Sequence, residues 1–327
     1  MKIMFYDTKP YDKIWFQPLG EEMGYKIKFQ EVKLNEDTAI LAKNYDAVCI
    51  FVNDDAGKET IKTLKKLGVR TILLRCAGFN NVDLKAAKEA DIKVLRVPSY
   101  SPEAVAEYAM GLLLTVNRNI HRAYVRTRDF NYNINGLMGI DLVGKTAGVI
   151  GTGKIGQMMI DILKGFKMHI LAYDPYPVKG LDAEYVDLDR LFRESDVISL
   201  HCPLTKDTRH IINKKNIEKM KDGVLLVNTS RGGLINTGDL IEALMARKFA
   251  GVGLDVYEEE DEYFFEDKSN DIITDEDLIR LTSFRNVILT SHQAFFTRDA
   301  MEAIAKVTME NARAVEEGTE LKNQVLP

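Results

Sequence analysis

The chain has 327 residues, of which 46% are hydrophobic and 28% charged, and its formal net charge is −5. This length is more than one ordinary core needs and suits two domains of a globular protein. The negative balance argues against binding to nucleic acid or to an anionic membrane by bulk electrostatics, but leaves room for a local basic site that takes an anionic substrate.

The cysteines and the apolar runs indicate the cellular compartment in which the protein works. Cys49, Cys76 and Cys202 are far apart and form no CxxC pair, which indicates neither a zinc site nor a redox motif. Sparse thiols in largely apolar runs favour a reducing compartment. No run approaches 18 uncharged apolar residues, and the N-terminus does not resemble a signal segment. We therefore expect a cytoplasmic protein without a membrane span and without a metal site.

The first hundred residues alternate between short apolar runs and amphipathic stretches. Four runs predict strands and one stretch between them predicts a helix; the strands are 3–6, 47–52, 71–74 and 93–97, and the helix is 83–90. Strands that alternate with helices are typical of a parallel α/β sheet. Ser101 and Pro102 then suit the N-cap and first residue of a long helix that ends near Arg118. Its apolar residues cover too much of its surface for a helix with a solvent-exposed face, so we expect it to be buried between domains or between subunits.

A second α/β series begins near residue 146. Its predicted strands are 147–150, 169–173, 197–201, 224–228, 252–256 and 287–290, and a helix is expected at 298–317. The α/β pattern therefore occurs twice along the chain.

The strongest local motif is GTGKIG, residues 151–156, which follows the first strand of that second series. Gly151 permits a tight turn, Gly153 lets the backbone approach a pyrophosphate, and Gly156 allows close packing of helix and strand. Asp174 ends the next strand and can accept hydrogen bonds from ribose hydroxyls, which favours NAD over NADP. A glycine-rich turn without a ligand is the alternative for the motif, and a turn residue before Pro175 is the alternative for Asp174.

Three side chains suited to hydride-transfer chemistry follow predicted strands. Arg231 can bind a carboxylate through two parallel hydrogen bonds. His292 belongs to the residue type that most readily exchanges a proton near neutral pH, and Glu260 can stabilise its protonated form. Taken singly, each is open to a structural or surface interpretation. His201 and His210 compete for the role of proton donor, and the position of His201 suits contact with the cofactor equally well.

Several motifs together resemble the D-isomer-specific 2-hydroxyacid dehydrogenases, and the resemblance covers essentially the whole chain. They are the segments 151–156, 227–232, 253–258 and 291–295. Within this family, the segments 75–83, 97–104, 120–124 and 264–269 most resemble fermentative D-lactate dehydrogenases.

The resemblance implies an α/β fold of two doubly wound parallel-sheet domains. A Rossmann-type NAD domain, residues 100–298, would be inserted into a flavodoxin-like substrate domain made of residues 1–99 and 299–327. The acidic run 258–271 would be a loop pinned by Tyr263, Phe264 and Phe265. Members of the family are typically homodimers, with the helix after Pro102 in the interface.

The resemblance also implies roles for single residues. Arg231 would bind the substrate carboxylate and polarise the keto group, His292 would give the proton during reduction, and Glu260 would pair with His292. The other implied substrate contacts are the amides near Ala77 and Gly78 and the side chains of Tyr100 and Phe295. The implied NAD contacts are Gly151, Gly153, Lys154, Ile155, Gly156, Asp174, Cys202, Pro203, Thr208, Thr229, Ser230, Arg231 and Asp255.

The implied activity is the NADH-dependent reduction of pyruvate to D-lactate. The nearest alternative is a dehydrogenase for a bulkier 2-keto acid, because one methylene in a pocket changes selectivity by only about 1–3 kcal/mol. An alternative from another class is an NAD-sensing binding protein similar to the corepressors of this family. Retention of Arg231, Glu260 and His292 favours the enzyme.

Overall fold

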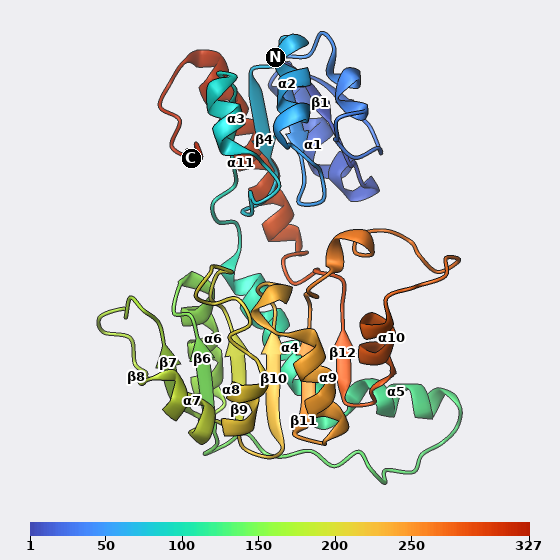
Figure 1. Cartoon of the computed structure of the whole chain (residues 1–327), viewed down its shortest axis with the longest axis vertical. Coiled ribbons are helices and arrows are strands. Elements are labelled where there is room, and N and C mark those ends of the chain that lie inside the picture. Colours follow the sequence, from blue (N-terminus) through green and yellow to red (C-terminus); the bar gives the residue numbers. More distant parts are fainter. The chain divides into compact units, whose positions relative to one another are not determined.

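In the computed structural model, which describes residues 1–327, the chain divides into two units. The first comprises Met1–Ser101 and Phe296–Pro327, and the second is the continuous stretch Pro102–Phe295. The second unit is thus inserted into the sequence of the first, and Figure 1 follows the chain through both.

The first unit is built on a parallel five-stranded sheet in the order β2-β1-β3-β4-β5. This is the flavodoxin-like strand order of doubly wound sheets. Helices α1 and α11 pack against each other, as do α2 and α3. The strands are β1 (Lys2–Phe5), β2 (Lys26–Phe29), β3 (Ala47–Ile50), β4 (Thr71–Leu74) and β5 (Lys93–Leu95); the helices are α1 (Pro10–Glu22), η1 (Thr38–Ala42), α2 (Lys58–Lys66), α3 (Leu84–Glu89) and α11 (Arg298–Glu317).

The second unit holds a parallel seven-stranded sheet in the order β12-β11-β10-β9-β6-β7-β8. Its strands are β6 (Thr146–Ile150), β7 (His169–Tyr173), β8 (Glu184–Tyr185), β9 (Val197–Leu200), β10 (Val224–Asn228), β11 (Phe249–Leu254) and β12 (Val287–Leu289). Its helices are α4 (Pro102–Arg118), α5 (Ile120–Arg128), α6 (Lys154–Gly165), α7 (Leu188–Glu194), α8 (Lys214–Lys219), η2 (Gly232–Leu234), α9 (Thr237–Met245), η3 (Glu260–Glu262) and α10 (Glu276–Ser283).

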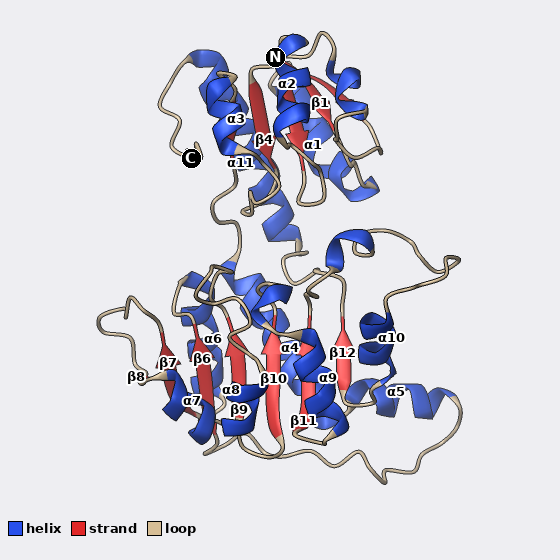
Figure 2. Ribbon diagram, viewed as in Figure 1, coloured by secondary structure: helices blue, strands red, loops and turns tan.

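Helices cover both faces of this second sheet, as Figure 2 shows. Helices α4 and α6 form one apolar core with the sheet, and α7, α8, α9 and α10 form the other. Helix α4 comes close because β11 carries glycine where it passes. A Cβ at Gly251 would lie 2.9 Å from Val116, and one at Gly253 would lie 3.0 Å from Leu112. The broad apolar surface of α4 is therefore buried largely within its own unit.

The predicted fold class is confirmed: both units are doubly wound parallel sheets, and the second has the Rossmann strand order. Within the acidic run, Phe264 is buried in the core, and Tyr263 and Phe265 pack partly against it. None of the helices is both long enough and apolar enough to cross a lipid bilayer.

Candidate active site

The glycine motif connects β6 to α6, and the geometry of this turn accounts for each of its three glycines. Gly151 has a φ of +95°, and a Cβ there would overlap the backbone of Cys202. A Cβ at Gly156 would overlap the carbonyl oxygen of Gly151. Helix α6 begins at Lys154, and its N-cap Gly153 has no side chain to cover the first amides. The positive end of a 12-residue helix is therefore open to an anion such as a pyrophosphate.

Asp174 stands half-buried at the end of β7 and stabilises this turn. Its Oδ2 accepts hydrogen bonds from the backbone amide of Thr152 at 2.7 Å and from the Thr152 hydroxyl at 3.1 Å. Its Oδ1 accepts the amide of Tyr176 at 2.8 Å. The turn after β7 and the turn after β6 are thus joined by one carboxylate. A carboxylate has about four acceptor positions, so Asp174 retains one for a ribose hydroxyl.

The loops after β9 and β10 are also tied together. The Ser230 hydroxyl donates to the carbonyl of Cys202 at 2.7 Å, and the Thr208 hydroxyl donates to that of Pro203 at 2.6 Å. The Thr229 hydroxyl is buried and has no hydrogen-bond partner in the protein. Buried hydroxyls are normally paired, so this one is available to a bound group. The strand order reverses between β6 and β9, which is where doubly wound sheets bind dinucleotides.

Arg231, Glu260 and His292 follow three neighbouring parallel strands, β10, β11 and β12. The carboxyl ends of these strands lie at one edge of the sheet, so the structure gathers the three residues there. His292 Nδ1 lies 2.6 Å from Glu260 Oε1, and both side chains are largely buried. The other carboxylate oxygen, Glu260 Oε2, accepts the amide of Tyr257 at 2.9 Å, which fixes the carboxylate.

Asp255, at the end of β11, holds the segment that carries His292. Its carboxylate is completely buried and accepts hydrogen bonds from the Thr290 hydroxyl at 2.5 Å and from the amides of Gln293 and Ala294 at 3.0 and 2.7 Å. The Asp255 carbonyl accepts the amide of His292 at 2.7 Å. Burial raises the pKa of this carboxyl. The sequence suggested Asp255 only as a cofactor contact, since hydrogen bonds between distant segments leave no local pattern.

The guanidinium of Arg231 is not neutralised within the protein. One of its nitrogens donates to the carbonyl of Ser230 at 2.7 Å, and it forms no ion pair with any carboxylate. Its backbone is fixed by Asn228, whose side-chain amide donates to the Arg231 carbonyl at 2.9 Å. A half-buried arginine with spare donors is suited to an anionic ligand.

The two competing histidines have other surroundings. Burial lowers the pKa of His201 to about 4, so it is neutral near pH 7, and its Nε2 lies 2.8 Å from the Ser199 hydroxyl. His201 therefore has no proton to give as an imidazolium. His210 Nε2 is bound to Glu258 Oε1 at 2.6 Å, and Glu258 also pairs with Arg209 at 3.1 Å. Glu258 thus contacts both His210 and Arg209.

The remaining predicted substrate contacts divide between the units. Ala77, Gly78 and Tyr100 belong to the first unit, and Phe295 is a buried residue of the second. The loop after β4 is held from two sides: Arg96, which follows β5, donates to the carbonyl of Ala77 at 2.8 Å, and Cys76 Sγ within the loop donates to that of Gly78 at 3.3 Å.

Comparison with known proteins decides the family. The sequence pattern of the D-isomer specific 2-hydroxyacid dehydrogenase NAD binding domain matches residues 110–294. The chain belongs to the D-isomer specific 2-hydroxyacid dehydrogenase family. It is 54% identical over 329 residues to the D-lactate dehydrogenase of Escherichia coli K12, with 100% of both chains covered.

Two solved structures extend this family likeness to three dimensions. The apo-structure of D-lactate dehydrogenase from Escherichia coli has a TM-score of 0.92 at 50% identity and covers 100% of both chains. The pyruvate reductase of Chlamydomonas reinhardtii has a TM-score of 0.94 at 41% identity, over 99% of this chain and 98% of that one. The chain is thus a family oxidoreductase that uses NAD, and the open helix end at Gly153 and the unpaired Thr229 hydroxyl fit that cofactor.

Proposed function

We propose that this 2-hydroxyacid dehydrogenase reduces pyruvate to D-lactate with NADH and catalyses the reverse oxidation. The observation that carries the proposal is the His292–Glu260 pair, with 2.6 Å between Nδ1 and Oε1. Beside it in the strand order, after β10, stands Arg231, which has no carboxylate partner. A cation for a carboxylate and a held proton donor are what the protein must add to hydride transfer.

Each of the three residues has one task in the reduction. NADH, when bound, supplies the hydride that adds to C2 of the keto acid. Arg231 binds the substrate carboxylate and polarises the keto group. Because Glu260 holds Nδ1 of His292, the Nε2–H is left to donate its proton to the oxygen that gains negative charge. His292 ends the step neutral and regains a proton from solvent before the next turnover.

The remaining assignments follow the family resemblance. We assign substrate recognition to the first unit, with the amides near Ala77 and Gly78 and the side chain of Tyr100, and add Phe295 from the second unit. NAD binding belongs to the second unit. Asp174 would meet the ribose hydroxyls and repel the extra phosphate of NADP, so we expect strong preference for NADH over NADPH.

A substrate panel tests the proposal. The specificity constant kcat/KM is measured for pyruvate, 2-ketobutyrate and 2-ketoisocaproate, each with NADH and with NADPH. We expect the highest value for pyruvate with NADH. A higher value for 2-ketoisocaproate would assign the chain to the bulkier-acid alternative. Failure to oxidise NADH with any of the three would favour the NAD-sensing binding protein.

We also propose that the protein is a cytoplasmic homodimer. Large apolar side chains stand exposed over α5 and the segment that follows it; they are Ile120, Tyr124, Val125, Phe130, Tyr132, Ile134, Met138, Ile140 and Val143. Exposed apolar patches of this kind mark association surfaces. The three free and buried cysteines suit a reducing compartment.

A further inference from the structure

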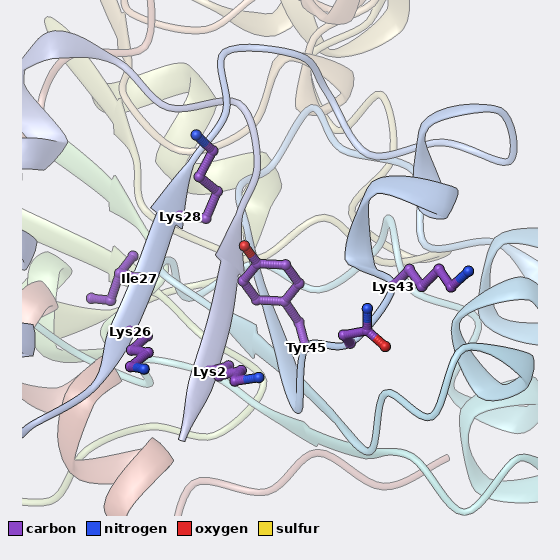
Figure 3. A pocket seen from close by; sticks show the side chains of 7 residues that line it. Lys2, Lys26, Ile27, Lys28, Lys43 and Tyr45 are labelled. Carbon is purple, nitrogen blue, oxygen red and sulfur yellow. The ribbon is translucent and has the colours of Figure 1, made fainter.

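The first unit contains a lysine-rich pocket that the proposed reaction does not use. It lies beside β1, β2 and the segment before β3, has a volume of about 540 Å³ and is open to solvent. No acidic side chain lines it. Figure 3 shows the lining residues, which are Lys2, Lys26, Ile27, Lys28, Lys43, Asn44 and Tyr45.

The strand register brings three of these lysines to one face of the sheet. Lys2 of β1 is paired directly with Lys26 of β2. Lys28, two residues along β2, points to the same face and is paired with Met4. Neighbouring strands lie about 4.8 Å apart and alternate residues about 6.6 Å apart along a strand. Like charges directly opposite each other destabilise a sheet, so this arrangement costs folding free energy.

No carboxylate neutralises the four lysines. The side chains of Lys2, Lys26, Lys28 and Lys43 are exposed and form no ion pair or hydrogen bond within the protein. The carboxylate of Asp46 accepts the backbone amide of Lys2 at 2.7 Å and so offsets part of this charge, but it forms no ion pair with any of the four ammonium groups. Several lysines elsewhere form ion pairs, as in Lys214 with Glu242, Lys221 with Asp196 and Lys248 with Asp222. A chain of net charge −5 therefore concentrates four unpaired positive charges around one pocket.

The chemistry of the lining indicates the ligand class. Ammonium groups bind phosphate oxygens as point charges. Four of them, spread over two strands and the segment before β3, carry more positive charge than one carboxylate, or one phosphate of about −2 charge, can neutralise. The Asn44 amide and the half-buried Tyr45 can add hydrogen bonds. We propose that this lysine pocket binds a small anion carrying two or more phosphate groups.

Within the first unit, the pocket lies at the other ends of the strands from the predicted substrate contacts. Lys2 opens β1, Lys26 opens β2, and Lys43–Tyr45 precede β3, so the pocket is centred on the amino ends of these strands. Ala77 and Gly78 instead follow the carboxyl end of β4 in the same parallel sheet. Anion binding would relieve the repulsion among the lysines and stabilise the first unit by mass action.

The test measures binding of inorganic diphosphate by isothermal titration calorimetry. The protein is saturated with NADH, so that the turn at residues 151–156 is occupied. The test variant is Lys26→Gln with Lys28→Gln, and the matched control is Lys65→Gln with Lys66→Gln, two exposed lysines on α2 of the same unit. Inorganic phosphate serves as the comparison ligand.

We expect diphosphate to bind the unmodified protein more tightly than phosphate does. The affinity should fall about tenfold or more in the test variant and stay unchanged in the control. Without the anion, the test variant should unfold at an equal or higher temperature than the unmodified protein, because it lacks the repulsion. Raising the salt concentration from about 50 to 200 mM should weaken binding, since exposed charges are screened.

Three results would overturn the proposal. Equal loss of affinity in the test and control variants would indicate nonspecific attraction of the anion to surface lysines. No binding at millimolar diphosphate would show that the pocket does not bind this class of ligand. Unchanged binding together with self-association of the test variant would show that the lysines instead protect the edge strand β2 from pairing with another chain.

Discussion

His292 is held by both its backbone and its side chain. Its φ is +53°, in the left-handed region that few residues with a side chain adopt. The hydrogen bond from the His292 amide to the Asp255 carbonyl stabilises this conformation, and the hydrogen bond to Glu260 fixes the imidazole ring. Because a carboxylate only accepts hydrogen bonds, Nδ1 must carry the proton in this pair, and Nε2 is left for the substrate.

Removal of the imidazole tests its role in the reaction. In His292→Ala, kcat for pyruvate reduction should fall by about 10²–10⁴, the usual contribution of general acid–base catalysis. Steady-state kinetics gives kcat, and titration of NADH fluorescence gives the dissociation constant of the cofactor. The affinity for NADH should stay close to that of the unmodified protein. Turnover near the normal rate would exclude His292 as the proton donor.

The half-buried histidine His201 should make the protein sensitive to acid. Burial lowers its pKa to about 4 from the usual 6.5, so between these values the unfolded chain binds more protons than the folded one. The free energy of unfolding should therefore fall as pH decreases through this window. From pH 7 to pH 5, the contribution of His201 is about 1–2 kcal/mol.

His201→Gln should lose less stability on acidification than the unmodified protein does. Urea-induced unfolding followed by circular dichroism at pH 7 and pH 5 measures the difference. His169→Gln, at an exposed histidine on β7, is the control and should behave like the unmodified protein. If both variants lose as much stability as the unmodified protein, His201 is not the group responsible.

At the scale of the elements, the ends of β10, β11 and β12 do the positioning. Each strand places one functional side chain shortly after its last residue, and Asp255 ties the end of β11 to the segment after β12. The position of His292 thus depends on a carboxylate that is fully engaged with its own protein. We regard Asp255 as a positioning residue.

Weakening this contact should lower turnover. Asp255→Asn keeps the size of the side chain but replaces one carboxylate oxygen with an NH2 donor that cannot accept the hydrogen bonds made there, so kcat should fall by about 10- to 100-fold through misplacement of His292. Thr290→Val removes one of the three bonds and should give a smaller loss. If Asp255→Asn changes only the affinity for NADH and leaves kcat unchanged, Asp255 acts on the cofactor and the positioning role is wrong.

Sequence patterns predicted the buried strands of both sheets and the helices α3, α4 and α11 well. Their apolar runs or N-terminal signals are local, and β4, β7, β10, α4 and α11 have the predicted bounds. Strand β2 was not predicted, because as an edge strand it alternates exposed lysine with half-buried apolar residues over only four positions. Helix α1 was missed as well, since Pro18 interrupts its pattern. The Asp255 contacts depend on tertiary structure and left no signal.

For the whole molecule, the strongest sequence evidence came from several motifs in a fixed order. That order led to the family and to NAD, both of which are confirmed. The roles of single residues and the dimer remain predictions, because contacts within one chain do not show how that chain binds substrate, cofactor or a second subunit.

The exposed apolar segment gives a test of assembly. Phe130 and Ile134 are 81% and 79% exposed, so replacing both with Asp should leave the fold intact but oppose their burial between subunits. Sedimentation equilibrium should show two chains of 37.0 kDa for the unmodified protein and one for the variant. Ile272→Asp, at another exposed apolar residue outside this segment, should remain dimeric. A dimer that survives the double substitution would place the interface elsewhere.

The chirality of the product formed from pyruvate and NADH by the unmodified protein tests the proposed reaction most directly. Lactate is separated on a chiral column after the NADH has been consumed. We expect one molecule of D-lactate for each NADH oxidised. L-lactate, a racemic mixture, or consumption of NADH without any lactate would show that the proposed reaction is wrong.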